Sequence, residues 1–332
     1  MSETPILAVE ELKKYYPVRG GVFASKIGNV RAVDGVSFTI REGETLGLVG
    51  ESGCGKSTLA RVILHLEGAT EGRVLFGGSD LAHAAKDELF RQRRDIQMIF
   101  QDPYSSLNPR MSVGEIVREP LLVHRIGTKA EQIEAAAALI ETVGLKREML
   151  DRYPHEFSGG QRQRIGIARA LALSPKLVIA DEPVSALDVS VQSQVLNLML
   201  KLQRERNLTY LFITHDLSVV KHVSDSIAIM YLGRIVEIGP TERIFNDPKH
   251  PYTRALLQAI PVPDPRKKHR AVPLEGETPS PVSPPSGCPF HPRCAFAIPA
   301  CSETVPALES VNEPPDGLAA DHQAACIRKD EI

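Results

Sequence analysis

Two kinds of hydrophobic pattern run along the first 260 residues. Short or alternating apolar runs, typical of edge or antiparallel strands, occupy residues 6–9, 36–40 and 73–76. Continuous apolar runs, typical of fully buried strands, occupy residues 45–49, 96–100, 177–180 and 210–214. A terminal hairpin around Leu232-Gly233 is predicted by the runs 226–231 and 234–238. Helical segments separate the buried runs, so the pattern predicts an α/β protein with a largely parallel sheet.

A mostly helical pattern interrupts this alternation between residues 112 and 152. It includes an Ala-rich stretch at residues 130–143, which is closed by Gly144. We therefore expect a helical subdomain at about residues 105–160, inserted into the α/β core rather than adding strands to it.

The composition changes past residue 260. Residues 261–332 hold 14 of the 25 prolines and four of the five cysteines. Residues 279–285 have no helix or strand pattern, which indicates a linker or an extended wrap. We predict two domains, residues 1–260 and a C-terminal extension of residues 261–332.

Charge and hydropathy restrict the function classes. With a net charge of -2 over 332 residues, the chain has no overall basic field for nucleic acid or an anionic bilayer. No apolar run reaches the roughly 18 residues that cross a membrane. The opening Met-Ser-Glu-Thr-Pro lacks the charged region and apolar core of a signal peptide, so a cytoplasmic chain that binds no nucleic acid is expected.

The most specific motif is Gly-Glu-Ser-Gly-Cys-Gly-Lys-Ser at residues 50–57, a complete phosphate loop between a predicted strand and a predicted helix. Its glycines let successive backbone N–H groups point at phosphate oxygens. Lys56 supplies a positive charge to the terminal phosphates, and the Ser57 hydroxyl can ligate Mg²⁺. The expected ATP contacts in this region are Gly50, Ser52, Gly53, Cys54, Gly55, Lys56, Ser57 and Thr58.

Two further motifs follow about a hundred residues later. Phe-Ser-Gly-Gly-Gln at residues 157–161 can expose N–H groups and a hydroxyl to an anion at a helix N-terminus. Asp181 and Glu182 then end a buried apolar run. Adjacent carboxylates at a buried strand end are strongly unfavourable without a cation, which argues for a metal ion here.

With these motifs in this order, residues 6–260 resemble the nucleotide-binding subunits of ABC transporters. The resemblance implies a mixed sheet core, an antiparallel β subdomain and a helical insertion. It also implies that Glu182 is the general base for the attacking water and that His215 contacts the γ-phosphate. Gln101 matches the glutamine that touches Mg²⁺ and relays the nucleotide state to membrane subunits, and Asp181 matches the carboxylate that holds Mg²⁺.

The same resemblance implies that two subunits close around ATP. Phe157 stands where the family signature usually has Leu; the signature residues that would contact the γ-phosphate of the opposite subunit are Ser158, Gly159, Gly160 and Gln161. Asp188 ends the loop that couples the two nucleotide sites. Tyr16 falls at the position of the aromatic residue that stacks on adenine, with Tyr15 as the competing candidate.

The extension carries a C-x5-C-x6-C-x24-C pattern made by Cys288, Cys294, Cys301 and Cys326. Four thiolates can hold zinc or a [4Fe-4S] cluster, and free or disulfide-linked cysteines are the remaining alternative. The C-x2–4-C pairs usual for structural zinc are missing from the pattern. Together with His-Pro-Tyr-Thr at residues 250–253, the extension resembles that of bacterial dipeptide and oligopeptide importers, which implies the iron-sulfur cluster; His291 is a candidate extra ligand, although a turn role is favoured.

The resemblance implies an ATPase subunit that powers import of di- or oligopeptides from the cytoplasmic face of the inner membrane. Its expected partners are a second homologous ATPase subunit, two transmembrane permease subunits and an extracytoplasmic peptide-binding protein. A heterodimer is favoured over a homodimer. Other cargo (nickel, glutathione or oligosaccharide) is the alternative. A DNA-associated ABC ATPase is disfavoured, because no long coiled coil separates the motifs.

Overall fold

The computed structural model describes residues 5–20, 25–260, 276–311 and 322–332. Contacts within the chain define two compact units. Unit 1 comprises Met1–Ile6, Ile40–Glu44 and His83–Ile213. Unit 2 comprises Leu7–Thr39, Thr45–Ala82 and Thr214–Ile332, and therefore includes the extension. Residues 261–275 and 312–321 of the predicted extension lie outside the described ranges.

The sheet of unit 1 consists of parallel strands β6 (Ile96–Ile99), β7 (Leu177–Asp181) and β8 (Thr209–Thr214). β7 lies in the middle, with Ile96 opposite Leu177 and Leu177 opposite Thr209. Every residue of β7 and β8 is buried, which explains why both sequences are continuous apolar runs. Because the strands are parallel, the polar residues that follow them reach the same edge of the sheet.

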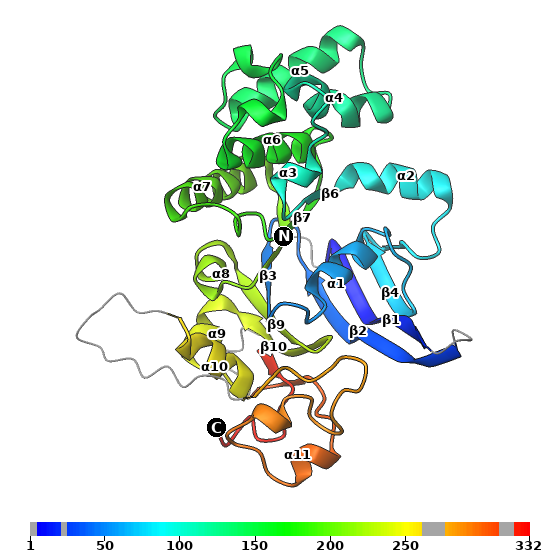
Figure 1. Ribbon diagram of the computed structural model, residues 1–332, viewed down its shortest axis with the longest axis vertical. Helices are drawn as coiled ribbons and strands as arrows, with labels where there is room; N and C mark the ends of the chain where they lie inside the picture. Colours follow the sequence, from blue (N-terminus) through cyan, green and yellow to red (C-terminus); the bar gives the residue numbers. More distant parts are fainter. Residues whose placement is uncertain (1–4, 21–24, 261–275, 312–321) are drawn as a thin grey trace, which may run out of the picture. The chain divides into compact units, whose positions relative to one another are not determined.

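The helices of unit 1 occupy the range of the predicted insertion and extend beyond it on both sides. They are α2 (Lys86–Asp95), α3 (Pro103–Ser106), α4 (Val113–Val123), α5 (Lys129–Thr142), α6 (Gly159–Leu171), α7 (Val189–Arg206) and the 3₁₀ helices Arg147–Met149 and Pro154–Glu156. Figure 1 shows α4 and α5 side by side, and both pack on α6. Capping boxes start α4 and α5, with Ser112 paired to Glu115 and Thr128 to Glu131. These reciprocal bonds satisfy N–H groups that a helix start leaves without partners.

Unit 2 contains the antiparallel β subdomain, a sheet with the order β2-β1-β4-β5. Its strands are β1 (Leu7–Gly20), β2 (Ser25–Ile40), β4 (Glu71–Phe76) and β5 (Ser79–Asp80). β1 and β2 are far longer than the predicted apolar runs. β1 continues through charged residues because its backbone pairs with β4 as far as Lys13 opposite Glu71, past a register shift after Glu10.

The other strands of unit 2 lie in the order β11-β12-β10-β9-β3 within a mixed sheet. Its strands are β3 (Thr45–Val49), β9 (Ser226–Tyr231), β10 (Arg234–Pro240), β11 (Glu309–Ser310) and β12 (Gln323–Ala324). β3 and β9 are parallel, and the remaining pairs are antiparallel. The predicted hairpin is confirmed as β9–β10. The strands β11 and β12, which come from the extension, were not predicted.

The helices of unit 2 are α1 (Lys56–Ile63), α8 (Leu217–Val223), α9 (Thr241–Asn246), α10 (Pro251–Gln258), α11 (Ala300–Glu303) and the 3₁₀ helix His291–Arg293. None of the helices in the described ranges is both long and apolar enough to cross a membrane. Residues 279–285 form neither helix nor strand, as predicted, and the carbonyl of Pro281 accepts the N–H of Arg31 at 3.1 Å.

The extension joins the core of unit 2 through its own side chains. Phe290 is only 2% exposed and belongs to a cluster with Tyr231 and Tyr252. Its ring centroid lies 5.4 Å from that of Tyr231 and 5.3 Å from that of Tyr252. On β10, the buried Glu237 hydrogen-bonds to His322 with 2.7 Å between Oε1 and Nε2. Buried aromatic area and a buried hydrogen bond therefore attach the extension to β9, β10 and α10.

Candidate active site

The phosphate loop connects the fully buried β3 to α1. At Gly55 the backbone has φ 111°, and a Cβ atom there would lie 1.9 Å from the carbonyl oxygen of Ala32, so the position requires glycine. The β9–β10 turn supports the loop, because the N–H of Gly233 donates to the carbonyl of Cys54 at 2.9 Å. Ser52 and Gly53 are exposed at the tip of the loop.

Lys56 folds back across this loop. Its ammonium group donates to the carbonyl oxygens of Gly50 at 2.7 Å and Glu51 at 2.9 Å, and the residue is only 5% exposed. Cys54 is also buried, and this burial raises the pKa of its thiol. A neutral thiol is a poor nucleophile, so Cys54 acts as a small filler of the loop. The remaining predicted loop residues, Ser57 and Thr58, are partly buried in the first turn of α1.

The two adjacent tyrosines of β1 have different partners. Tyr16 donates from its hydroxyl to Glu67, and the Thr58 side chain of α1 hydrogen-bonds to the same phenol. Tyr15 instead donates to Asp34, a buried carboxylate that also pairs with Arg234 at 2.7 Å. Burial, followed by the hydrogen bond to Asp34, raises the pKa of Tyr15 to about 12. Of the two candidates for adenine stacking, Tyr16 is therefore the one in contact with the helix that follows the phosphate loop.

Unit 1 brings three predicted residues to one edge of its sheet. Asp181, at the end of β7, is 6% exposed. Glu182 comes next, in a left-handed backbone conformation with φ 45°, and its N–H donates to the carbonyl of Ile213 at 2.8 Å. Gln101 follows the neighbouring β6, and its Nε2 donates to Glu182 Oε2 at 2.9 Å. The parallel pairing of β6 with β7, in which Ile99 lies opposite Ala180, is what makes this contact.

The signature motif forms the start of α6. Ser158 is the N-cap, and its hydroxyl accepts the N–H of Gln161 at 3.4 Å while Gln161 Oε1 accepts the N–H of Ser158 at 3.0 Å. Gly160 is buried against α7, and a Cβ atom there would lie 2.2 Å from Val191 Cγ1. The sequence motif therefore encodes both a helix cap and a close helix–helix contact.

The last two predicted contacts lie at element ends. His215 is exposed and follows β8 directly, while Asp216 caps α8 by accepting the N–H of Ser218 at 2.8 Å. Asp188 is the exposed N-cap residue of α7. Each unit thus holds part of the predicted set. Unit 2 holds the phosphate loop, Tyr16 and His215, and unit 1 holds the acidic pair, Gln101, the signature motif and Asp188.

The four cysteines of the extension line one small cavity of about 20 Å³, together with His291. However, no group of three or more His, Cys, Asp or Glu residues within the described ranges is arranged to hold a metal ion. The structure therefore does not confirm the expected metal site. Burial raises the pKa of the Cys288 thiol to about 11, so the metal-free thiol is neutral.

The sulfur atoms nevertheless have polar partners. The backbone N–H of Arg328 donates to Cys326 Sγ at 3.4 Å. The N–H groups of Phe290 and Phe296 hydrogen-bond to the sulfurs of Cys288 and Cys294, respectively. Backbone N–H groups also donate to the thiolate sulfurs of iron-sulfur clusters.

Two residues of the site were missed by sequence reasoning. Glu51, the second residue of the phosphate loop, is not among the expected ATP contacts, yet it forms a bidentate ion pair with Arg293 of the extension. Both residues lie inside motifs that were recognised. Nothing local in either motif indicates that they meet, because 242 positions separate them.

Comparisons with known proteins match two families to this chain. The ABC transporter family matches residues 33–185, a range that contains the phosphate loop, Gln101, the signature motif and the acidic pair. A second family, the C-terminal region of oligopeptide/dipeptide transporters, matches residues 236–301, which contain Cys288, Cys294 and Cys301.

Individual relatives extend this match over nearly the whole chain. The probable peptide ABC transporter ATP-binding protein y4tS of Sinorhizobium fredii is 55% identical over 314 residues, which are 95% of this chain and 88% of that protein. The oligopeptide transport ATP-binding protein AppF of Bacillus subtilis is 52% identical over 329 residues, 98% of each chain.

A solved structure is similar in fold and sequence. It is the dimeric, post-hydrolysis ATP-binding cassette MJ0796 bound to ADP and Pi, which is 30% identical with a TM-score of 0.63. The match covers 71% of this chain and 98% of that one. The chain therefore belongs to the ABC transporter family as an ATP-binding cassette ATPase with the C-terminal region of oligopeptide/dipeptide transporters.

Proposed function

We propose that this ABC ATPase drives the import of dipeptides or oligopeptides through a membrane transporter. The observation that carries the proposal is the alignment with AppF, an oligopeptide transport ATP-binding protein, over 98% of both chains, extension included. The same ATPase with nickel, glutathione or oligosaccharide as cargo is the alternative. A DNA-associated ABC ATPase is less favoured.

The chemistry that we propose is hydrolysis of the terminal phosphate of ATP by an attacking water. The phosphate loop holds the triphosphate, Glu182 accepts the proton of the water, and His215 contacts the γ-phosphate. Support comes from the hydrogen bond of Gln101 to Glu182, which orients the carboxylate from a neighbouring strand. Tyr16 is proposed to stack on adenine.

Mg²⁺ is the proposed cation of the site. Its ligands would be the Ser57 hydroxyl, the Gln101 amide oxygen and the Asp181 carboxylate. All three supply oxygen atoms, which are the ligands that Mg²⁺ prefers. The hydrogen bond to Glu182 uses the amide nitrogen of Gln101 rather than its oxygen, so the two roles are compatible. Bound there, the ion would neutralise charge on the triphosphate.

We further propose that ATP is enclosed between two such subunits. The phosphate loop of one subunit and residues 158–161 of the other would contact the same triphosphate, and Asp188 would couple the two sites. The partners would be a second homologous ATPase subunit, two transmembrane permease subunits and a peptide-binding protein outside the cytoplasm. This assembly would hold the chain at the cytoplasmic face of the inner membrane, with residues 1–260 as the nucleotide-binding domain and residues 261–332 as the extension.

The catalytic assignment is tested with Glu182→Gln, which keeps the shape of the side chain but removes the base. ATP turnover should fall at least about 100-fold, the lower end of what a general base contributes. Binding of MgATP should be retained. Glu205→Gln, an exposed position on α7, is the control and should turn over ATP like the parent. Turnover by Glu182→Gln within a few-fold of the parent would remove Glu182 from the mechanism.

Cargo is tested by uptake in cells that lack this chain. Labelled dipeptides and oligopeptides should enter when the parent chain is restored and should not enter with Glu182→Gln. Labelled nickel, glutathione and oligosaccharide are measured in parallel. Rescue of one of these uptakes instead of peptide uptake would replace the peptide assignment while leaving the ATPase assignment intact.

The four cysteines of the extension are proposed to hold a [4Fe-4S] cluster, with zinc as the alternative. Anaerobically purified protein should contain about four irons per chain and absorb near roughly 400 nm. Cys294→Ser should lose the metal, whereas Cys54→Ser, the fifth cysteine, should not. One zinc per chain would point to a closed structural site. Protein without iron or zinc would exclude both.

A further inference from the structure

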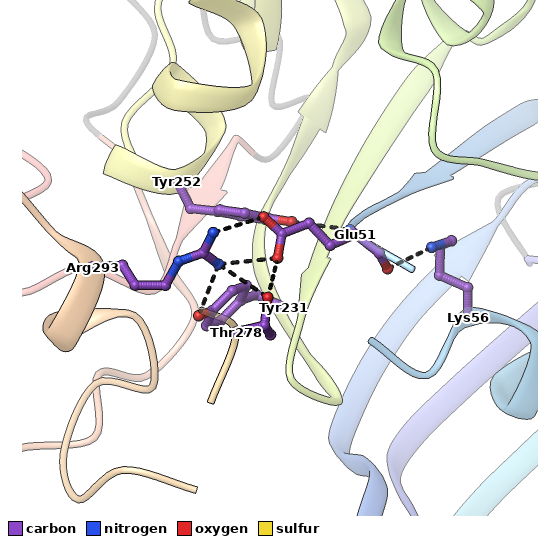
Figure 2. Close-up of polar contacts among 6 residues, drawn as sticks. All are labelled: Glu51, Lys56, Tyr231, Tyr252, Thr278 and Arg293. Atoms are coloured by element: carbon purple, nitrogen blue, oxygen red, sulfur yellow. Dashed lines mark hydrogen bonds and ion pairs between the residues drawn. The ribbon is translucent and has the colours of Figure 1, made fainter. Parts of the chain in front are cut away.

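Glu51 directs its side chain away from the phosphate loop and into the extension. Its two carboxylate oxygens accept hydrogen bonds from Arg293, with Nη1 at 3.0 Å and Nη2 at 3.1 Å (Figure 2). Thr278 adds a third bond from its hydroxyl at 2.8 Å. Side-chain exposure is 7% for Arg293 and 24% for Glu51, so water screens this pair only weakly.

The backbone of the same residue contacts the rest of the site. The N–H of Glu51 donates to the hydroxyl of Tyr252 at 3.1 Å, and its carbonyl accepts from the ammonium group of Lys56 at 2.9 Å. Figure 2 shows Glu51 between Arg293 on one side and Lys56 on the other. A displacement of Glu51 would therefore move the first turn of the phosphate loop and a carbonyl that orients its lysine.

Arg293 is held in place by the turn that carries two of the cysteines. It ends the 3₁₀ helix His291–Arg293, its N–H donates to the carbonyl of Phe290 at 3.0 Å, and Cys294 follows it directly. Its guanidinium group also donates to the hydroxyl of Tyr231 at 3.3 Å. Burial lowers the pKa of Arg293, but the bonds to Glu51 and Tyr231 outweigh this and raise it, so the group stays charged.

The negative charge of Glu51 bears on nucleotide binding. A carboxylate in the second position of a phosphate loop lies next to the site of a polyanion and repels it unless it is neutralised. Arg293 provides that neutralisation as a bidentate partner. Without Arg293, the loop would keep its negative charge and lose the contact that holds its first turn.

We propose that Arg293 is a positioning residue for ATP, through which the cysteine-bearing turn of the extension sets the affinity of the phosphate loop. The extension thereby acts on nucleotide binding and does not merely attach to the cassette. The contact lies wholly within unit 2, so it can operate in a single chain.

The test measures the Kd for MgATP on the full chain, by displacement of trinitrophenyl-ATP. Arg293→Gln should raise this Kd about 10-fold, which corresponds to about 1.4 kcal/mol. Arg293→Lys keeps the charge but has a single nitrogen in place of the two that bind the carboxylate, so its Kd should lie between those of Arg293→Gln and the parent. The control is Lys329→Gln, which breaks an ion pair with Glu309 inside the extension and should leave the Kd within about 2-fold.

A second substitution shows whether Arg293 positions the phosphate loop or merely attaches the extension. In Arg293→Gln, the added Glu51→Gln change removes the unpaired carboxylate, so the double variant should bind MgATP more tightly than Arg293→Gln alone. If Arg293 merely attached the extension, the double variant would bind no better than Arg293→Gln. That result, or a Kd for Arg293→Gln within about 2-fold of the parent, would overturn the proposal. If Arg293→Gln does not fold, Arg293→Met, which also removes the positive charge, is compared with and without Glu51→Gln in the same way.

Discussion

Glu182 combines an unusual backbone with the proposed role of general base. A non-glycine residue with φ 45° is in the left-handed region, which costs of order 1–3 kcal/mol and persists only where neighbours enforce it. Here the carbonyl of Ile213 accepts its N–H, and Gln101 donates to its side chain. The local strain therefore aims a carboxylate in a direction that a continued strand would not allow.

Adenine stacking depends on a single aromatic ring. Tyr16→Ala should raise the Kd for ATP about 10-fold or more, because stacking of a base on an aromatic ring contributes about 1–3 kcal/mol. Tyr16→Phe keeps the ring and should bind ATP nearly like the parent. Tyr15→Ala should leave the Kd within about 2-fold but lower stability, since Asp34 loses a buried donor. The reverse order of Kd values would assign stacking to Tyr15.

The β9–β10 hairpin shows how a whole element supports the site. Its turn has positive φ at both Leu232 (45°) and Gly233 (80°), the geometry of a type I′ turn that matches the twist of two paired strands. The N–H of Gly233 donates to the carbonyl of Cys54 in the phosphate loop, and the carbonyl of Gly233 accepts the N–H of Asp34. One turn thus links the hairpin, the antiparallel subdomain and the loop.

Gly233→Ala is expected to disturb this link. The new Cβ atom would lie 2.9 Å from the carbonyl oxygen of Arg31, in a left-handed conformation that alone costs roughly 1–2 kcal/mol. The free energy of unfolding, measured by denaturant titration, should fall by at least that amount. Gly68→Ala is the matched control, because a Cβ atom there meets nothing within 4 Å. Equal stability of the two variants would mean that the turn can rearrange.

At the scale of the whole molecule, the extension is part of unit 2 rather than an appendage. Phe290 enters the aromatic cluster, Glu237 binds His322, and β12 adds to β10 with Ala324 opposite Glu237. These contacts give a proline-rich segment a core that its own composition does not supply. These contacts can therefore keep the extension attached without a metal. The extension then holds Arg293 next to Glu51 of the phosphate loop.

Dimerisation would bring two whole subunits together around ATP. In the Glu182→Gln background, and with the second homologous ATPase subunit present, MgATP should convert monomers to dimers, detected by light scattering during size-exclusion chromatography. Adding Gly159→Asp places a carboxylate at the start of α6, where the proposed γ-phosphate contact lies, so repulsion should prevent the dimer while leaving ATP binding to single chains intact. Gly166→Ala on the same helix is the control and should dimerise. Dimers of the Gly159→Asp variant would refute the proposed contact.

Much of the structure of the cassette is predictable from residues that are adjacent in the sequence. The phosphate loop, the buried strands β7 and β8, the capping boxes of α4 and α5 and the hairpin turn are all encoded in patterns of a few adjacent positions. Such features depend on backbone conformation and hydrogen bonds within one element, which local side chains control. The order of the motifs was enough to suggest the family, which the comparisons confirmed.

The contacts between distant segments were decided by the tertiary structure alone. The length of β1, the pairing of β12 with β10, the choice of Tyr16 as the neighbour of Thr58 and the bond between Glu51 and Arg293 depend on partners far away in the chain. A strand edge or a carboxylate accepts many partners equally well. Which one it meets is determined by how the whole chain packs, because burial and chain closure, not local propensity, select among them.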